Sequence, residues 1–229
     1  MFGEYVPNIA FDDPLNLALH LYETRYPLEM ETHFSASDPR LLDVIPIAVR
    51  GMQMCAHETY FDCPYYEQLM YAGDTRLECL TTYVMTPDDR LPHQFLRLFD
   101  SSRDSTGLTQ GRYPNRTFQV IHNFALWWAA SVYDYAHWRD DLAFVRARMP
   151  GVRAVLEGFM QWLNPEGLVG PIEGWPFMDW VPHWPGGNPP DAVFGVSALI
   201  NWHYALVLAM IADLEEKLGE DEMAARWRG

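Results

Sequence analysis

Three carboxylates lie close together in residues 61–74, which read FDCPYYEQLMYAGD. We call this stretch the acidic segment. Asp62, Glu67 and Asp74 stand there among tyrosines, a leucine and a methionine. A charged side chain is costly to bury unless it is paired, hydrogen-bonded or protonated. The segment is therefore either a solvated turn with unrelated acids or a site where carboxyl groups do acid–base chemistry.

Glu67 is the acid that the local sequence favours for proton donation. Pro64 and Gly73 interrupt regular structure, so we expect a loop that runs into a helix beginning near Asp74. Burial of Glu67 among the apolar neighbours would favour its protonated form, which a general acid requires. The flanking acids also have structural explanations, because Asp74 could be the N-cap of the helix and Asp62 could cap a turn.

The spacing of the acids resembles the signature of bacterial α-L-rhamnosidases of glycoside hydrolase family 78. In that family a segment beginning Asp-Cys-Pro carries an acid five positions after the Asp and closes with Gly-Asp; this chain has DCP at 62–64, then Glu67, then GD at 73–74. The resemblance implies an (α/α)6 barrel of six helical hairpins. It also implies an inverting hydrolysis with Glu67 as proton donor and with Asp62 and Asp74 binding sugar hydroxyls.

The resemblance extends over residues 20–225 and departs from the family pattern within the acidic segment. Tyr66 stands where the family has an Arg before the central Glu, which removes a hydrogen-bond donor. Met70 and Tyr71 stand where the family has Gly-Trp. Because tyrosine keeps an aromatic face, we expect Tyr71 to contact the sugar.

The general base is the largest departure. The family's base is a Glu that follows a Trp in a later hairpin, and no such pair follows residue 180. The predicted helices also amount to about half of those in a full barrel. We therefore expect the chain to be the N-terminal part of a catalytic domain, inactive by itself unless Glu173 or Asp179 serves as the base.

Residues 171–190, which we call the tryptophan loop, read PIEGWPFMDWVPHWPGGNPP. Its prolines exclude a helix and a central strand, and structureless loops of this length are often functional. Trp175, Trp180 and Trp184 would offer flat faces to a sugar, and Asp179 would accept hydrogen bonds from its hydroxyls. We expect this loop to face the acidic segment across one cleft. The alternative is that the tryptophans only plug the end of the barrel.

Apolar residues at spacings of three and four predict a chain that is helical nearly throughout. The expected helices cover residues 38–54, 74–85, 88–100, 117–137, 140–163 and 192–218, with the start of another at 220–229. Short turns alternating with long loops indicate helical hairpins, so we expect an all-α fold of the (α/α)6 type, with a bundle or solenoid as the alternative. The prediction is one domain or a fragment of one over 1–229, with an irregular lead-in over 1–35. Short strands within residues 1–35 or at 168–172 are a further possibility that the sequence does not decide.

The net charge of −15 argues against nucleic acids and anionic membranes as partners, because no basic stripe is available to neutralise phosphates. A neutral or cationic ligand fits this charge better, and the carbohydrate substrate that the resemblance implies is neutral. The apolar run 196–212 contains Asn201 and His203 and reads as a buried helix, and the acidic run 213–222 reads as a solvated helix end. The N-terminus has no signal-peptide pattern, so we expect a cytoplasmic protein.

Neither the eight histidines nor the three cysteines show a metal-binding spacing, so no metal or other cofactor is predicted. Three hypotheses for the function follow. The first is a glycosidase acting on rhamnosides or glycosides of a related sugar. The second is a carbohydrate-binding relative without catalysis, and the third is a helical interaction scaffold. An open half-barrel would leave apolar helix faces uncovered, which favours self-association.

Overall fold

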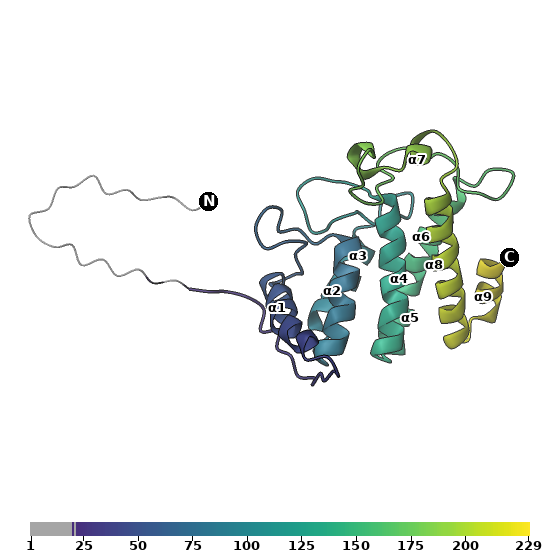
Figure 1. Ribbon diagram of the computed structural model, residues 1–229. Helices are drawn as coiled ribbons and strands as arrows, with labels where there is room; N and C mark the ends of the chain where they lie inside the picture. The colour runs from purple at the N-terminus through teal and green to yellow at the C-terminus, as the bar shows by residue number, and fades with distance from the viewer. Residues whose placement is uncertain (1–19, 21) are drawn as a thin grey trace, which may run out of the picture.

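The computed structural model describes residues 20 and 22–229, and the regular structure in this part of the chain is helical (Figure 1). The elements are α1 (Arg40–Met54), α2 (Ala72–Met85), α3 (Arg90–Ser101), α4 (His122–Trp138), α5 (Leu142–Arg146), α6 (Met149–Met160), the 3₁₀ turn η1 (Pro185–Gly187), α7 (Pro190–Phe194), α8 (Ala198–Lys217) and α9 (Asp221–Arg228). Extended residues in the described part form only isolated bridges, such as Leu163 with Val169. Residues 168–172 therefore contain no strand, and the first 35 residues lie partly outside the described ranges.

The helices are joined into hairpins, as the sequence predicts. Short turns connect α2 to α3, α4 to α5 and α8 to α9, whereas long loops at 55–71, 102–121 and 161–197 connect one hairpin to the next. The long loops gather at the upper end of the molecule in Figure 1, which we call the loop end, and the turns lie at the opposite turn end. This arrangement brings segments that are distant in sequence to one end of the helices.

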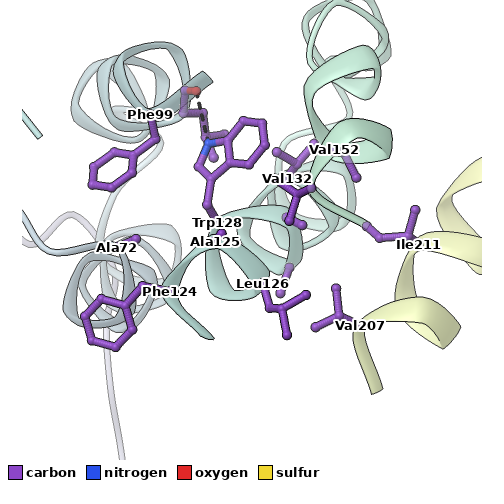
Figure 2. Close-up of a cluster of buried hydrophobic side chains, with 14 of the residues drawn as sticks. Ala72, Phe99, Phe124, Ala125, Leu126, Trp128, Val132, Val152, Val207 and Ile211 are labelled. Atoms are coloured by element: carbon purple, nitrogen blue, oxygen red, sulfur yellow. Dashed lines mark hydrogen bonds between the residues drawn. The ribbon is translucent and has the colours of Figure 1, made fainter. Parts of the chain in front are cut away.

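Helix α4 forms the centre of the fold. It packs against α2 on one side and α8 on the other, and it also contacts α3, α5 and α6. Its side chains are buried on nearly every face, because its sequence is apolar nearly all round. Figure 2 shows Trp128 of α4 within this core, near Phe99 of α3 and Val152 of α6, and shows Val207 and Ile211 reaching toward α4 from α8.

Two of the predicted helices are divided in the structure. The expected helix over 140–163 breaks after Arg146 into α5 and α6, and Pro150 lies in the first turn of α6, where its missing N–H costs least. The expected helix over 192–218 is preceded by the short α7, and Gly195 follows the end of α7. In both cases the prediction missed a point where one helix ends and another begins, because the apolar spacing continues across the interruption.

Helix α1 is less buried than its spacing suggests. None of its residues is buried, and Leu41, Val44 and Ile47 are exposed by 50%, 53% and 73%. The helix begins at Arg40, whose backbone N–H donates to the Asp38 carboxylate over 3.0 Å. Its apolar spacing is therefore real, but in the described part of the chain little covers that face.

The interpretation of 213–222 as a solvated helix end is wrong for one of its acids, and Leu214 and Leu218 are also buried. Glu215 of α8 is fully buried, and both of its oxygens accept from Arg153 of α6 at 2.8 and 2.7 Å. Such a bidentate pair satisfies a buried carboxylate that would otherwise be costly. This contact ties the last turn of α8 to α6.

Helix α8 extended by one residue, Ala198–Leu218, is long and apolar enough to cross a membrane by length and composition. Core helices of globular proteins meet the same criterion. Here the helix packs against α4 and α9, and Val207 and Ile211 are fully buried. Packing therefore accounts for one face of the helix, whereas Leu199, Trp202 and Leu206 are exposed by 42%, 77% and 51%, so the prediction of a buried helix is only partly confirmed.

Candidate active site

The acidic segment is held as a closed loop by its own hydrogen bonds. The backbone N–H of Leu69 donates to the Asp62 carboxylate over 2.9 Å, and the N–H of Asp62 donates to the Leu69 carbonyl over 2.9 Å. Within this loop the N–H of Glu67 donates to the Cys63 sulfur over 3.3 Å. Asp62 thus stabilises the turn with one oxygen, as its structural explanation predicts, and also borders the cavity described below.

Helix α2 begins two residues before the position expected from the sequence. Its N-cap is Tyr71, so Gly73 and Asp74 lie inside the first turn and the N-cap explanation for Asp74 is wrong. A side chain at Gly73 would come within 2.7 Å of the Phe124 ring, so this glycine lets α2 pack closely on α4. Asp74 is left with its carboxylate near the positive end of the helix dipole.

The tryptophan loop is fixed against the loop end of α4. The Asn123 side chain donates to the Phe177 carbonyl over 2.6 Å, and the Trp175 indole N–H donates to the Gly186 carbonyl over 2.8 Å. The N–H of Met178 also donates to the Gly187 carbonyl over 2.9 Å. These bonds hold the two halves of the loop together over the beginning of α4.

The acidic segment and the tryptophan loop line one cavity of about 390 Å³ at the loop end. Its lining residues are Asp62, Glu67, Tyr71, Gly73, Asp74, Arg76, Leu77, Ile121, Phe124, Trp127, Trp175, Phe177, Met178, Asp179 and Trp180. The expectation of a shared cleft is confirmed, and the predicted site residues that border it are Asp62, Glu67, Tyr71, Asp74, Trp175, Asp179 and Trp180. Trp184 and Glu173 are not among them, and the roles considered for these two residues lose their geometric basis.

Glu67 is exposed, contrary to the expectation that apolar neighbours bury it. Tyr65 and Tyr66 are themselves exposed by 69% and 89%, and their rings pack on each other at 5.1 Å rather than over the acid. The reason is the path of the loop, which turns both tyrosines toward solvent. Desolvation by these neighbours therefore gives no support to a protonated Glu67 in the free chain.

Within the acidic segment, Asp74 has a pKa that is raised by its position at the cavity. Although its side chain keeps accessible area, that area borders the cavity, where protein atoms surround the carboxyl. This desolvation raises the pKa of Asp74 above its usual range, and the negative charges of Asp62, Glu67 and Asp179 act in the same direction. The cavity thus brings together four carboxyl groups, and the charges of the other three act on Asp74.

Glu78 is an acid near the cavity that the sequence does not single out. It lies one helical turn after Asp74 on α2, and its Oε2 atom is buried without a hydrogen-bond partner. Burial raises the pKa of Glu78 to about 9, and the charges of Asp74 and Asp62 add to the effect. Its side chain is therefore a neutral acid at neutral pH.

We expect Glu78→Gln to stabilise the fold by about 3–5 kcal/mol at about pH 8, since each unit of pKa shift corresponds to about 1.4 kcal/mol. The folded chain holds this proton up to pH about 9, whereas the unfolded chain releases it near pH 4.5. Stabilisation by the protonated acid is complete below the lower value and is lost as the pH rises toward the higher one. Glutamine does not undergo this loss.

Urea unfolding of the wild type and of Glu78→Gln at about pH 4 and about pH 8 measures this difference. Glu166→Gln, in an exposed part of the 161–197 loop, is the matched control. The advantage of Glu78→Gln should nearly vanish at the lower pH. An equal difference at both values would contradict the prediction.

Arg76 and Trp127 also border the cavity without having been predicted. Arg76 donates to Asp134 over 2.7 Å, and its guanidinium lies 4.6 Å from the centre of the Trp127 ring. Among the residues that the structure describes, Arg76 is the only cation in the cavity lining. Arg76 occupies an ordinary polar position of an amphipathic helix, so the sequence gave no indication that it borders a cavity.

No group of three or more His, Cys, Asp or Glu in the described ranges could hold a metal ion.

The comparison with known families shows to which family the chain belongs. A family model described as the bacterial alpha-L-rhamnosidase 6 hairpin glycosidase domain matches residues 29–229. The chain belongs to this family. The resemblance inferred from the acidic segment is confirmed, and the helical hairpins are those of the six-hairpin α-L-rhamnosidase domain.

Two solved structures share the rhamnosidase fold. One is the GH78 family rhamnosidase of Bacillus sp. GL1, with a TM-score of 0.79 and 26% identity over 89% of this chain and 20% of that chain. The other is a rhamnosidase from Klebsiella oxytoca with rhamnose bound, with a TM-score of 0.71 and 22% identity over 90% of this chain and 38% of that chain. No curated protein matches. The chain thus spans well under half the length of either solved relative.

Proposed function

We propose that the chain supplies the proton donor and much of the sugar-binding cavity of an inverting glycosidase that cleaves terminal α-L-rhamnosides or glycosides of a related sugar. The observation that carries the proposal is the convergence of Asp62, Glu67 and Asp74 with Trp175 and Trp180 on one cavity. Carboxyl groups facing aromatic platforms are what hydrolysis of a glycosidic bond requires.

Glu67 would donate its proton to the glycosidic oxygen as the bond to the anomeric carbon breaks. A water attacking the opposite face of the sugar would give its proton to a second carboxylate, so the anomeric configuration is inverted. Because Glu67 is exposed in the free chain, bound sugar itself would have to remove water from this carboxyl. Asp62 and Asp74 would accept hydrogen bonds from sugar hydroxyls.

Asp179 is the acid that reaches the cavity from the tryptophan loop. Of the two acids considered as a base, it lines the cavity and Glu173 does not. The N–H of Trp180 donates to one oxygen of Asp179 over 2.7 Å, which leaves the other oxygen for a ligand. We propose sugar binding as its role, and loss of turnover without loss of rhamnose affinity in Asp179→Asn would instead assign it as the base.

The apolar walls support a deoxysugar as the ligand. The cavity is also bordered by Phe124, Trp127, Phe177 and Met178. Rhamnose carries a methyl group in place of a hydroxymethyl group, and a methyl group is favoured against such walls. The solved Klebsiella oxytoca rhamnosidase holds rhamnose, which supports the same substrate class for this chain.

Calorimetric titration with rhamnose and hydrolysis of 4-nitrophenyl α-L-rhamnoside test the proposal together. Saturable binding with turnover and inverted product would support it. Binding without turnover would favour a carbohydrate-binding relative. A chain that neither binds nor cleaves would favour the helical scaffold.

We expect Trp180→Ala to weaken rhamnose binding by about 3- to 10-fold, the usual worth of one aromatic contact. The Trp180 side chain is 70% exposed, so its removal should leave the stability of the fold nearly unchanged. Titration of rhamnose with thermal unfolding of the same samples measures both effects. Trp138→Ala, at the turn end of α4, is the control. Unchanged affinity with a large loss of stability would identify Trp180 as a plug.

A further inference from the structure

The loop between α3 and α4 lies directly beside the start of α2. The N–H of Ala72 donates to the Gly111 carbonyl over 3.0 Å, and the N–H of Tyr113 donates to the Met70 carbonyl over 3.1 Å. These bonds make an antiparallel bridge in which Arg112 stands opposite Tyr71. A side chain at position 111 would come within 2.5 Å of Ile121, so glycine there permits the close approach.

Arg112 directs its charge at the hydroxyl of Tyr71. Its Nη1 donates to the Tyr71 hydroxyl oxygen over 2.9 Å, and the guanidinium carbon lies 5.6 Å from the centre of the tyrosine ring. The Arg112 side chain is half-buried, and its Nε is buried without a hydrogen-bond partner. A cation is thus held behind a residue of the cavity wall, while Arg112 itself does not line the cavity.

Tyr71 and Glu67 border the same cavity, and Arg112 contacts the Tyr71 hydroxyl from outside its lining. Burial and the nearby Glu67 carboxyl together raise the pKa of Tyr71 to about 12, while Arg112 opposes the effect. The phenol therefore keeps its proton at neutral pH. Because its oxygen accepts from Arg112, its own O–H is free to donate toward Glu67.

We propose that Arg112, acting through the hydroxyl of Tyr71, is a positioning residue for Glu67. The inference rests on the proposed function of Glu67 as proton donor. With one carboxyl oxygen held by the Tyr71 hydroxyl, the other oxygen is presented to the glycosidic oxygen. Tyr71 keeps its proton throughout, and the proton transferred to the leaving group is that of Glu67. Tyr66, directly before Glu67 in the chain, is 89% exposed and supplies no such contact.

The kinetic test compares Arg112→Gln, Tyr71→Phe and the double variant on aryl rhamnosides with good and poor leaving groups. Each single variant is expected to lose about 10- to 100-fold in kcat on the poor leaving group, the worth of a hydrogen bond to a charged group. Rhamnose affinity should change less than about 2-fold, since phenylalanine keeps the ring face. The double variant should be no worse than the worse single one. Arg112→Lys should recover part of the loss, and Tyr66→Phe should behave as the wild type.

A second readout does not depend on turnover. In protein labelled with ¹³C at the glutamate carboxyl, the Glu67 resonance is identified by its absence in Glu67→Gln. At about pH 8, Arg112→Gln and Tyr71→Phe should each shift this resonance, whereas Tyr66→Phe should leave it unchanged. In the double variant, Arg112→Gln should cause no shift beyond that caused by Tyr71→Phe alone. An unmoved resonance in the single variants, or additive losses equal on both leaving groups, would overturn the inference. A shifted resonance in a chain that neither binds nor cleaves rhamnosides would overturn the proposed function and leave the arrangement of Arg112, Tyr71 and Glu67 standing.

Discussion

In a protein that contains the complete catalytic domain, Glu67→Gln is expected to lower the turnover of rhamnosides with poor leaving groups by about 10²–10⁴-fold, the contribution of a general acid. Glutamine keeps the size of the side chain and removes the proton that would be donated. A leaving group that departs without protonation should lose much less. Because Glu67 is exposed, thermal unfolding should change little.

The measurement is kcat/KM on a pair of aryl rhamnosides that differ in the acidity of the released phenol. Glu166→Gln, an exposed acid outside the cavity, is the matched control. Equal losses on both substrates would argue against proton donation, and activity like that of the wild type would exclude the role altogether.

Trp128→Ala is expected to destabilise the fold by about 3–5 kcal/mol, the range for removing a large aromatic side chain from a core. Trp128 is fully buried in α4 and its indole N–H donates to the Leu96 carbonyl of α3 over 3.2 Å (Figure 2). Truncation would leave a cavity between α3, α4 and α6 and would remove the partner of a buried carbonyl. Both effects act in the same direction.

Urea unfolding followed by circular dichroism measures this loss. Trp128→Phe should cost less, because most of the apolar volume is retained. Trp138, at the end of the same helix, is 46% exposed. Trp138→Ala therefore shows how much of the loss is caused by burial of the tryptophan rather than by removal of any tryptophan. A cost for Trp128→Ala no larger than that for Trp138→Ala would show that α4 does not form the centre of the core.

The helices were largely predictable because burial imposes a period on the sequence. The strongest case is α4, where apolar residues on every face predicted a helix in the middle of the fold. Its start at His122 rather than near 117 was not predictable, since Gln119 and Gly111 are drawn into a backbone contact between loops that only the fold creates. The lack of burial of α1 was unpredictable for a similar reason, because periodicity shows which face is apolar and not whether anything covers it.

The site was predictable where short spacing fixes geometry. Asp62, Glu67 and Asp74 lie within one loop and one helical turn, so their convergence follows from the segment itself. That this segment lies across one cavity from Asp179 and Trp180 depends on the tertiary fold. It was predicted because the hairpin pattern places the long loops at one end of the helices. Glu78 and Arg112 were missed, because burial of the first and the contact of the second with Tyr71 depend on how loops and helices pack.

The separation of the loop end from the turn end has a consequence for how this domain can diversify. The cavity is bordered by the long loops and the adjoining ends of α2 and α4, and the turns that join α2 to α3 and α8 to α9 contribute nothing to it. Doubling the length of a flexible loop costs only about 0.6 kcal/mol in closure entropy. Insertions at the loop end can therefore reshape the ligand preference over evolutionary time, while the turn end keeps the register of the hairpins.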